Sequence, residues 1–130
     1  MKMLMGRRHV KYSCSEFKAD MDNLEQEIKS TGKKYKWVYG LPRGGLIPAV
    51  VFSHRLKLKL LLTLKEKHVP EQTLIVDDIS DTGKSLLKIP KIHRYDVATI
   101  YIKIDTKFVP KWHTRVAKKN EWIVYWWENS

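Results

Sequence analysis

The sequence contains a single cysteine, Cys14, so no disulfide can form within the chain. This composition is typical of proteins kept in a reducing compartment, and we expect a cytoplasmic location. Long apolar runs are missing as well, because the longest, Leu56–Leu64, includes Lys57 and Lys59 and is too short to cross a bilayer. The basic start of the chain has no apolar core of signal-peptide length. These absences favour a soluble intracellular protein with no membrane partner.

Acidic residues are few beside basic ones: 14 Asp and Glu stand against 25 Lys and Arg, for a formal net charge of +11. A basic surface concentrates anions, so nucleic acids, acidic lipids and phosphorylated metabolites are the candidate partners. For any single basic cluster, solvated surface lysines are the better explanation. For the whole protein we favour a small polyanionic substrate and keep nucleic acid as an alternative. The 130 residues have room for one core of useful size, so we expect a single domain spanning residues 1–130.

The hydrophobic pattern alternates between the periods of helix and strand. Ser13 and Glu16 have the spacing of a capping box, and apolar residues at positions 17, 21, 24 and 28 then share one helix face. The order of elements predicts an α/β fold with a central, mostly parallel sheet flanked by helices and with sites at the carboxyl ends of the strands. The expected strands are Trp37–Tyr39, Leu56–Leu64, Thr73–Val76, Val97–Ile104 and Trp122–Trp127, and the later helices are Leu46–Leu56 and Lys84–Ile89.

The strongest local pattern is an apolar strand followed by Asp-Asp-Ile-Ser-Asp-Thr-Gly-Lys-Ser. The hydroxyls of Thr82 and Ser85, with the free backbone amides after Gly83, would form a phosphate cradle at a helix N-terminus. The adjacent carboxylates of Asp77 and Asp78 suit the vicinal hydroxyls of a ribose, or a Mg²⁺ ion held through water. The final Gly-Lys-Ser is shared with the P-loop. A P-loop, however, requires glycine where this chain has Asp78, so that interpretation is excluded.

A second pattern is the glycine-rich loop Gly-Leu-Pro-Arg-Gly-Gly at residues 40–45, directly after an expected strand. Arg43 offers a forked cation to a diphosphate, and Gly44 and Gly45 leave backbone amides accessible. On its own, this loop could equally be a tight turn before a helix. Its place ahead of the Asp-Asp sequence, which also follows a strand, favours a shared anion site.

These two loops resemble the pyrophosphate loop and the 5-phosphoribosyl-1-pyrophosphate (PRPP) motif of the type I phosphoribosyltransferases. The resemblance implies the fold of that family, a Mg²⁺ cofactor, and contacts of Asp77 and Asp78 with the ribose hydroxyls and the metal. It also implies two catalytic residues, because Asp81 would manage a proton of the incoming base and Arg43 would stabilise the leaving diphosphate. The residues implied to bind phosphates are Arg43, Gly44 and Gly45 for the diphosphate and Asp81, Thr82, Gly83, Lys84 and Ser85 for the 5′-phosphate.

The later part of the chain resembles one branch of that family, the xanthine/guanine phosphoribosyltransferases. By that resemblance Lys103 meets the 6-oxygen of a purine, Trp122 stacks on the base, and the backbone of Ile123 contacts its edge. A tryptophan-rich segment can equally belong to a core or a dimer interface, and we assign Trp126 and Trp127 to packing. The implied activity is that of a pentosyltransferase in purine salvage, which moves the 5-phosphoribosyl group from PRPP to guanine, xanthine or hypoxanthine and releases pyrophosphate. We also expect a homodimer or homotetramer.

Only Glu66–Gln72 separate the expected second and third strands, which is shorter than the mobile hood loop that covers the substrates in that family. A shortened hood loop would leave the site wetter and the chemistry slower. The main alternative is therefore a non-catalytic PRPP- or nucleotide-binding regulator of the same fold that contacts RNA. An inactive structural relative ranks last, because Thr82, Gly83 and Ser85 are all present.

Overall fold

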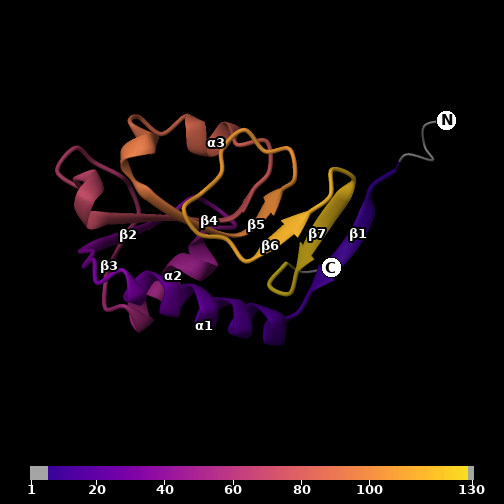
Figure 1. Cartoon of the computed structure of the whole chain (residues 1–130), viewed down its shortest axis with the longest axis horizontal. Helices are drawn as coiled ribbons and strands as arrows, with labels where there is room; N and C mark the ends of the chain where they lie inside the picture. Colours follow the sequence, from indigo (N-terminus) through magenta and orange to yellow (C-terminus); the bar gives the residue numbers. More distant parts are fainter. Residues whose placement is uncertain (1–5, 129–130) are drawn as a thin grey trace.

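The computed structural model describes residues 6–128, in which a five-stranded sheet has the order β3-β2-β4-β5-β6 (Figure 1). Every neighbouring pair in it is parallel, and β1 and β7 form a second, two-stranded parallel sheet. The predicted α/β fold with a mostly parallel central sheet is therefore confirmed. The elements are β1 (Arg8–Tyr12), α1 (Cys14–Ser30), β2 (Trp37–Gly40), α2 (Leu46–Arg55), β3 (Lys59–Leu61), β4 (Thr73–Ser80), α3 (Lys84–Leu87), β5 (Asp96–Lys103), β6 (Arg115–Ala117) and β7 (Glu121–Tyr125), with short 3₁₀ helices at Pro70–Gln72 and Ile92–Arg94.

Helices cover both faces of the sheet, with α1 and α2 on one side and α3 on the other (Figure 1). The larger hydrophobic core joins α1 and α2 to the sheet and includes Met21, Val38 and Phe52, which are fully buried. A smaller core joins α3 to the other face through Leu86 and Ile75. Burial on both faces explains why the start of β4 is a continuous apolar run. No helix within residues 6–128 is both long and apolar enough to span a membrane.

The capping box predicted at the start of α1 is present. The Ser13 hydroxyl accepts a hydrogen bond from the Glu16 amide at 3.1 Å, and the Glu16 carboxylate accepts one from the Ser13 amide at 2.9 Å. The four predicted apolar positions of the helix are all buried. These contacts are local in sequence, and this is why the pattern alone located the helix.

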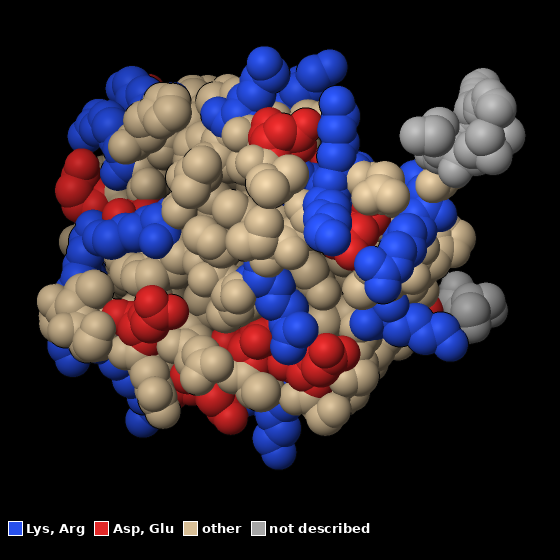
Figure 2. Space-filling view, turned by 45° about the vertical axis from the view of Figure 1, so that its right-hand side comes forward, with Lys and Arg blue, Asp and Glu red and all other residues tan. Residues whose placement is uncertain are grey.

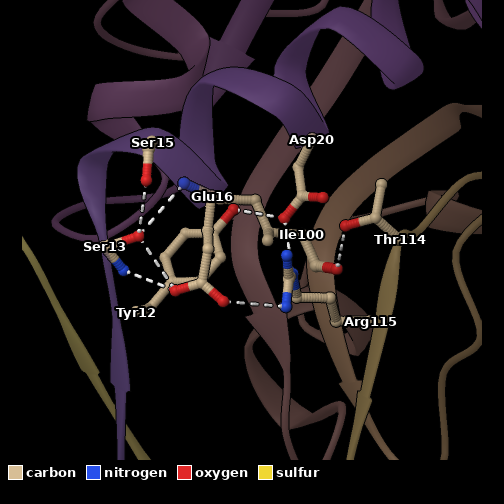
Figure 3. Close-up of polar contacts among 8 residues, drawn as sticks. All are labelled: Tyr12, Ser13, Ser15, Glu16, Asp20, Ile100, Thr114 and Arg115. Carbon is tan, nitrogen blue, oxygen red and sulfur yellow. Dashed lines mark hydrogen bonds and ion pairs between the residues drawn. The ribbon is translucent and has the colours of Figure 1, made fainter.

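A polar network ties α1 to β1 and β6 (Figure 3). Arg115 Nε donates to Asp20 Oδ2 at 2.7 Å, and Arg115 Nη1 lies 3.2 Å from Glu16 Oε2. The Tyr12 hydroxyl donates to the same Asp20 carboxylate at 2.5 Å, and the guanidinium of Arg115 lies over the Tyr12 ring. Asp20 is only 5% exposed, so these donors satisfy a buried charge that would otherwise be strongly unfavourable.

The prediction of a strand at Leu56–Leu64 is wrong for most of these residues. Helix α2 continues to Arg55, and the Leu56 amide closes its last turn. Only Lys59–Leu61 forms a strand, and Leu62 is 78% exposed. The alternating leucines fit a strand, but the first of them ends a helix. In addition, the neighbouring strand β2 is only four residues long and offers few pairing partners.

Strand β4 extends beyond its predicted end at Val76, so Asp77 and Asp78 lie on the strand and not in the predicted loop. Asp77 stands opposite Thr99 in the ladder with β5, and the pairing continues to Ser80. Backbone hydrogen bonds between strands do not depend on side-chain polarity, so the carboxylates do not interrupt the ladder. As a result, the two carboxylates are held by a rigid element.

Three smaller differences concern short elements. Helix α3 ends at Leu87, before the predicted end at Ile89. Strands β1 and β6 were not predicted. Strand β1 pairs with β7 from the other end of the chain, and β6 has only three residues, so neither has a recognisable local pattern.

The connection between β3 and β4, residues 62–72, is short and folds against the sheet. Within it, His68 Nδ1 accepts a hydrogen bond from the Lys65 amide at 2.9 Å. The buried His68 ring packs edge-on against Trp37, with ring centroids 4.8 Å apart. These contacts agree with the shortened hood loop expected from the sequence.

Arg115→Ala should destabilise the protein by about 2–3 kcal/mol, because the buried Asp20 carboxylate would keep only Tyr12 as a side-chain partner. The loss stays below that of a fully buried pair because the Arg115 side chain is 34% exposed. Urea unfolding at pH 7 measures the change. Arg94→Ala is the control, since its pair with Glu71 is more than half exposed and should contribute little to stability. Equal losses in the two variants would contradict the role given to the network.

Candidate active site

The loops that leave the carboxyl ends of β2 and β4 meet around one cavity. Its volume is about 280 Å³, and it is lined by residues 42–44 of the loop after β2 and by residues 77–86, which comprise the end of β4, the turn after it and the start of α3. Because β2 and β4 are adjacent and parallel, with Gly40 opposite Val76, both strands end toward the same edge of the sheet. The Leu41 amide donates to the Val76 carbonyl at 2.9 Å, which holds the bases of the two loops together.

Gly44 and Gly45 allow the first loop to approach β4 closely. A Cβ atom on Gly44 would lie 2.1 Å from Oδ2 of Asp78, and one on Gly45 would lie 2.6 Å from the Val76 carbonyl oxygen. Neither position accepts a side chain without a shift of its surroundings. The backbone of the glycine loop is therefore placed directly beside the Asp78 carboxylate.

Exposed charged side chains stand at the rim of this cavity, namely Arg43, Asp81 and Lys84. The peptide bond between Pro42 and Arg43 is cis. None of the three side chains takes part in a salt bridge within residues 6–128. The two cations are therefore free to meet an anionic ligand from opposite loops.

A tight turn follows β4 and leads into α3. Gly83 has a φ of +92°, and a Cβ atom there would lie 2.8 Å from the Phe108 amide nitrogen. The Thr82 hydroxyl accepts from the Lys84 amide at 3.2 Å, and Ser85 lines the same cavity. The turn thus offers hydroxyls and main-chain N–H groups to a tetrahedral anion. The helix expected after the turn is short, because α3 has only four residues, so its dipole adds little.

Asp77 is buried and Asp78 half-buried on the wall of the cavity. Asp77 Oδ1 accepts from the Asp78 amide at 2.8 Å, and Asp78 Oδ1 accepts from the Ile79 amide at 2.9 Å. Burial, and after it the hydrogen bond and charge of Asp78, raises the pKa of Asp77, and burial also raises the pKa of Asp78. Within residues 6–128 neither carboxylate has a Lys, Arg or His partner. Such a pair suits hydroxyl donors or a divalent cation.

The carboxylate oxygens of Asp77 and Asp78 suit a Mg²⁺ ion that binds together with a phosphorylated ligand. Mg²⁺ prefers oxygen ligands and is usually held by one or two carboxylates plus substrate phosphates and water. Within residues 6–128 no group of three or more His, Cys, Asp and Glu side chains forms a metal site by itself. Ligand oxygens or water would therefore complete the coordination of such an ion.

A second cavity, of about 150 Å³, adjoins the first and shares Asp78 and Asp81 with it. Its other walls come from the end of β5 and from β7. Lys103 is 7% exposed at the end of β5, and its ammonium group donates to the Lys119 carbonyl at 3.0 Å. The structure thus brings together all three residues predicted to bind a purine, Lys103, Trp122 and Ile123.

The three C-terminal tryptophans differ in their surroundings. Trp122 lines the second cavity, is 42% exposed, and has the guanidinium of Arg7 at 4.1 Å from its ring centroid. Trp126 and Trp127 instead contact Phe17 of α1, with ring centroids 5.8 and 5.4 Å away. These contacts support the packing role predicted for Trp127, whereas Trp126 is 45% exposed and packs only in part.

Three residues that the sequence patterns did not single out also line the second cavity: Glu121, Tyr125 and Glu128. Tyr125 could have been found by alternation, because residues two apart on a strand point to the same side and Ile123 was already selected. The Glu128 carboxylate accepts from the Tyr125 amide at 2.9 Å. No local signal marks Glu121, whose carboxylate pairs with Arg8 at 3.1 Å.

No family model matches the sequence. Among curated proteins, the xanthine-guanine phosphoribosyltransferase of Cereibacter sphaeroides is 26% identical over 116 residues, which cover 72% of this chain and 70% of that protein. The protein of the same name from Desulfotalea psychrophila is 27% identical over 118 residues, covering 74% and 72%. Among solved structures, a purine phosphoribosyltransferase from Pyrococcus horikoshii has a TM-score of 0.78 at 26% identity, covering 94% of this chain and 95% of that one.

The parallel sheet and the two facing loops agree with these similarities, which support a type I phosphoribosyltransferase. The curated relatives support a place close to the xanthine-guanine phosphoribosyltransferases. Identities of 26 and 27% support a purine phosphoribosyltransferase at the family level and leave the preferred base to be determined.

Asp77→Asn should stabilise the ligand-free protein, and more so at higher pH. Folding raises the pKa of this carboxyl and so favours its protonated form; stability is therefore lost as pH rises from the unfolded pKa through the folded one. The stability gained by the variant should be near zero at about pH 4 and reach about 1–2 kcal/mol by pH 8. Urea unfolding across this range measures it, with the exposed Asp105→Asn as control. A gain that does not change with pH would show that the carboxylate is not strained by burial.

Proposed function

We propose that this chain transfers the 5-phosphoribosyl group from PRPP to a 6-oxopurine and releases pyrophosphate, as in purine salvage. The observation that carries the proposal is the junction of two cavities of different chemistry. One is walled by the glycine–arginine loop and the Asp-Asp strand, and it shares Asp78 and Asp81 with another that is lined by a lysine and a tryptophan. A sugar phosphate suits the first and a planar base the second. The names of the relatives support the same reaction class.

PRPP occupies the first cavity in this proposal. The turn after β4 binds the 5′-phosphate through hydroxyls, main-chain N–H groups and the Lys84 ammonium. Asp77 and Asp78 accept hydrogen bonds from the ribose hydroxyls, and the loop after β2 receives the diphosphate. The residues assigned to phosphates are Asp81, Thr82, Gly83, Lys84 and Ser85 on one side and Arg43, Gly44 and Gly45 on the other.

The leaving diphosphate is stabilised by the glycine–arginine loop. Arg43 supplies a forked cation, and the main chain of Gly44 and Gly45 supplies N–H donors. A Mg²⁺ ion held by Asp77 and Asp78, directly or through water, would neutralise part of the diphosphate charge. The contacts from Arg43 and the glycines strengthen as the bond to the ribose breaks, because charge on the leaving group grows at that moment.

The reaction exchanges one bond at C1 of the ribose for another. The bond to the diphosphate oxygen breaks and its electron pair leaves with the diphosphate, while a purine nitrogen forms the new bond. Positive charge develops on the sugar ring, and the carboxylates of Asp77 and Asp78 offset it. The base must also lose a proton, and Asp81, which borders both cavities, is placed to manage the N7 proton.

Lys103 selects the base. Its ammonium group donates to the 6-oxygen of guanine, xanthine or hypoxanthine, but it cannot accept a hydrogen bond from the 6-amino group of adenine. The Lys119 carbonyl, 3.0 Å from Nζ, holds this side chain in place. Trp122 stacks on the ring of the base and the main chain of Ile123 meets its edge.

The short connection at residues 62–72 lines neither cavity. A site that no lid covers admits water, which weakens the electrostatic contribution to catalysis. We therefore expect turnover that is slow for this class of enzyme. A homodimer or homotetramer is part of the proposal, because a second subunit could supply the missing cover, and analytical ultracentrifugation measures it.

Pyrophosphate release should occur when the protein receives PRPP, Mg²⁺ and guanine, xanthine or hypoxanthine, and not with adenine. Asp81→Asn should lower kcat roughly 10²–10³-fold, because the proton acceptor is lost. Calorimetric binding of PRPP should persist in that variant. If the protein binds PRPP but releases no pyrophosphate with any of the four bases, the proposal of an enzyme would be wrong and a PRPP-binding regulator would be favoured. Full turnover by Asp81→Asn would remove its assigned role.

Lys103→Gln should weaken the preference for 6-oxopurines over adenine, because an amide can both donate and accept a hydrogen bond. We expect kcat/KM for guanine to fall roughly 10–100-fold and adenine to become a detectable substrate. Steady-state kinetics with the two bases measures the change, and KM for PRPP should stay constant. Lys84→Gln makes the same chemical change on the phosphate side and should raise KM for PRPP instead. If Lys103→Gln raised KM for PRPP and Lys84→Gln changed the preference for the base, the assignment of PRPP to the first cavity and the base to the second would be contradicted.

A regulator that contacts RNA is the second candidate, and a separate basic cavity favours it. This cavity, of about 290 Å³, lies between the C-terminal ends of α1 and α2. Lys and Arg also form several groups on the face that Figure 2 shows. RNA binding that falls steeply with salt, without turnover, would favour this candidate over the enzyme. The cations that line the cavity are Lys29, Lys33, Lys34, Arg55 and Lys57.

A further inference from the structure

Tyr125, on β7, carries the one buried side-chain nitrogen or oxygen of residues 6–128 that lacks a hydrogen-bond partner, its hydroxyl oxygen. The residue is only 4% exposed. Buried hydroxyls are almost always paired, because an unpaired one gives up its hydrogen bonds to water without replacement. A hydroxyl in this state is available to a partner that residues 6–128 do not supply in their present arrangement.

Aromatic rings hold the Tyr125 side chain in place. Trp127 stacks on it, with centroids 4.6 Å apart and ring planes at 8°. Tyr12 and Tyr101 meet it edge-on, with centroids 5.7 and 6.3 Å away. Close packing of this kind prevents the ring from swinging toward another acceptor. The partner of the hydroxyl must therefore move to it.

Two carboxylates of the candidate site act on this hydroxyl. Burial raises the pKa of the Tyr125 hydroxyl, and the charges of Asp78 and then Asp77 raise it further, so the group stays a hydrogen-bond donor. Tyr125 and Asp78 also line the same cavity. Asp78 is engaged with the backbone of its own strand, because its Oδ1 accepts from the Ile79 amide at 2.9 Å and its amide donates to Asp77 Oδ1 at 2.8 Å.

We propose that Tyr125 is a positioning residue of the ribose site, whose hydroxyl donates to Asp78 when PRPP is bound; this inference rests on the proposed function. Ribose hydroxyls that enter between Asp77 and Asp78 donate to both carboxylates and reset the orientation of the Asp78 side chain. Asp78, which borders both cavities, then has an oxygen to offer to the donor on β7. A hydrogen bond that only the complex makes contributes directly to the affinity for PRPP.

Tyr125→Phe tests this proposal, because it removes the hydroxyl and keeps the ring. The melting temperature of the ligand-free protein should stay the same or rise, since an unpaired polar atom is lost. Calorimetric binding of PRPP in the presence of Mg²⁺ should weaken about tenfold, the scale of one hydrogen bond to a charged group. In turnover, KM for PRPP should rise by a similar factor while KM for guanine stays constant.

Tyr12→Phe is the matched control, because Tyr12 belongs to the same aromatic cluster but its hydroxyl donates to Asp20. That variant should unfold more easily and bind PRPP as the wild type does. Unchanged PRPP affinity in Tyr125→Phe would overturn the inference, and so would a loss of stability equal to that of Tyr12→Phe. Failure of the proposed function has a different signature, since the wild-type protein itself would then not bind PRPP.

Discussion

β2 and β4 run parallel and side by side, and the backbone hydrogen bonds between them set the distance between the loops at their carboxyl ends. The rest of the candidate site depends on this pairing. Gly44 can stand beside Asp78 only because it lacks a Cβ atom, which would lie 2.1 Å from the carboxylate. The pairing is itself secured by the core, since Val38, Leu74 and Val76 are at most 1% exposed. The packing that stabilises the fold therefore also determines the geometry of the site.

The site collects groups that are unfavourable in the ligand-free protein. Among residues 6–128, no Lys, Arg or His pairs with the carboxylates of Asp77 and Asp78, and burial raises the pKa of both. In the same part of the chain the Tyr125 hydroxyl has no hydrogen-bond partner. Away from the site the same problem is solved internally, because the buried Asp20 receives two side-chain donors. Such a contrast is typical of functional sites, where the surrounding structure holds groups in a state that a ligand relieves.

Much of the candidate site could be predicted from sequence because its parts are short local patterns. Arg43 with its glycines, and the run from Asp77 to Ser85, each follow a strand and are recognisable in isolation. Alternation with Ile123 places Tyr125 on the same side of the expected last strand, but it does not show what the Tyr125 side chain does there. Its distinguishing property, a buried hydroxyl without a partner, depends on strands and helices that lie far away in the sequence.

The sequence by itself determined the chemistry of the loops, the capped start of α1 and the buried beginning of β4, because these depend on residues that are close along the chain. The tertiary structure decided where elements end and which groups meet. It assigned Leu56 to the end of a helix and kept Asp77 and Asp78 on a strand. It also paired β1 with β7, whose residues Arg8 and Glu121 are 113 positions apart. Strand pairing and burial are contacts between distant residues, so no local pattern can specify them.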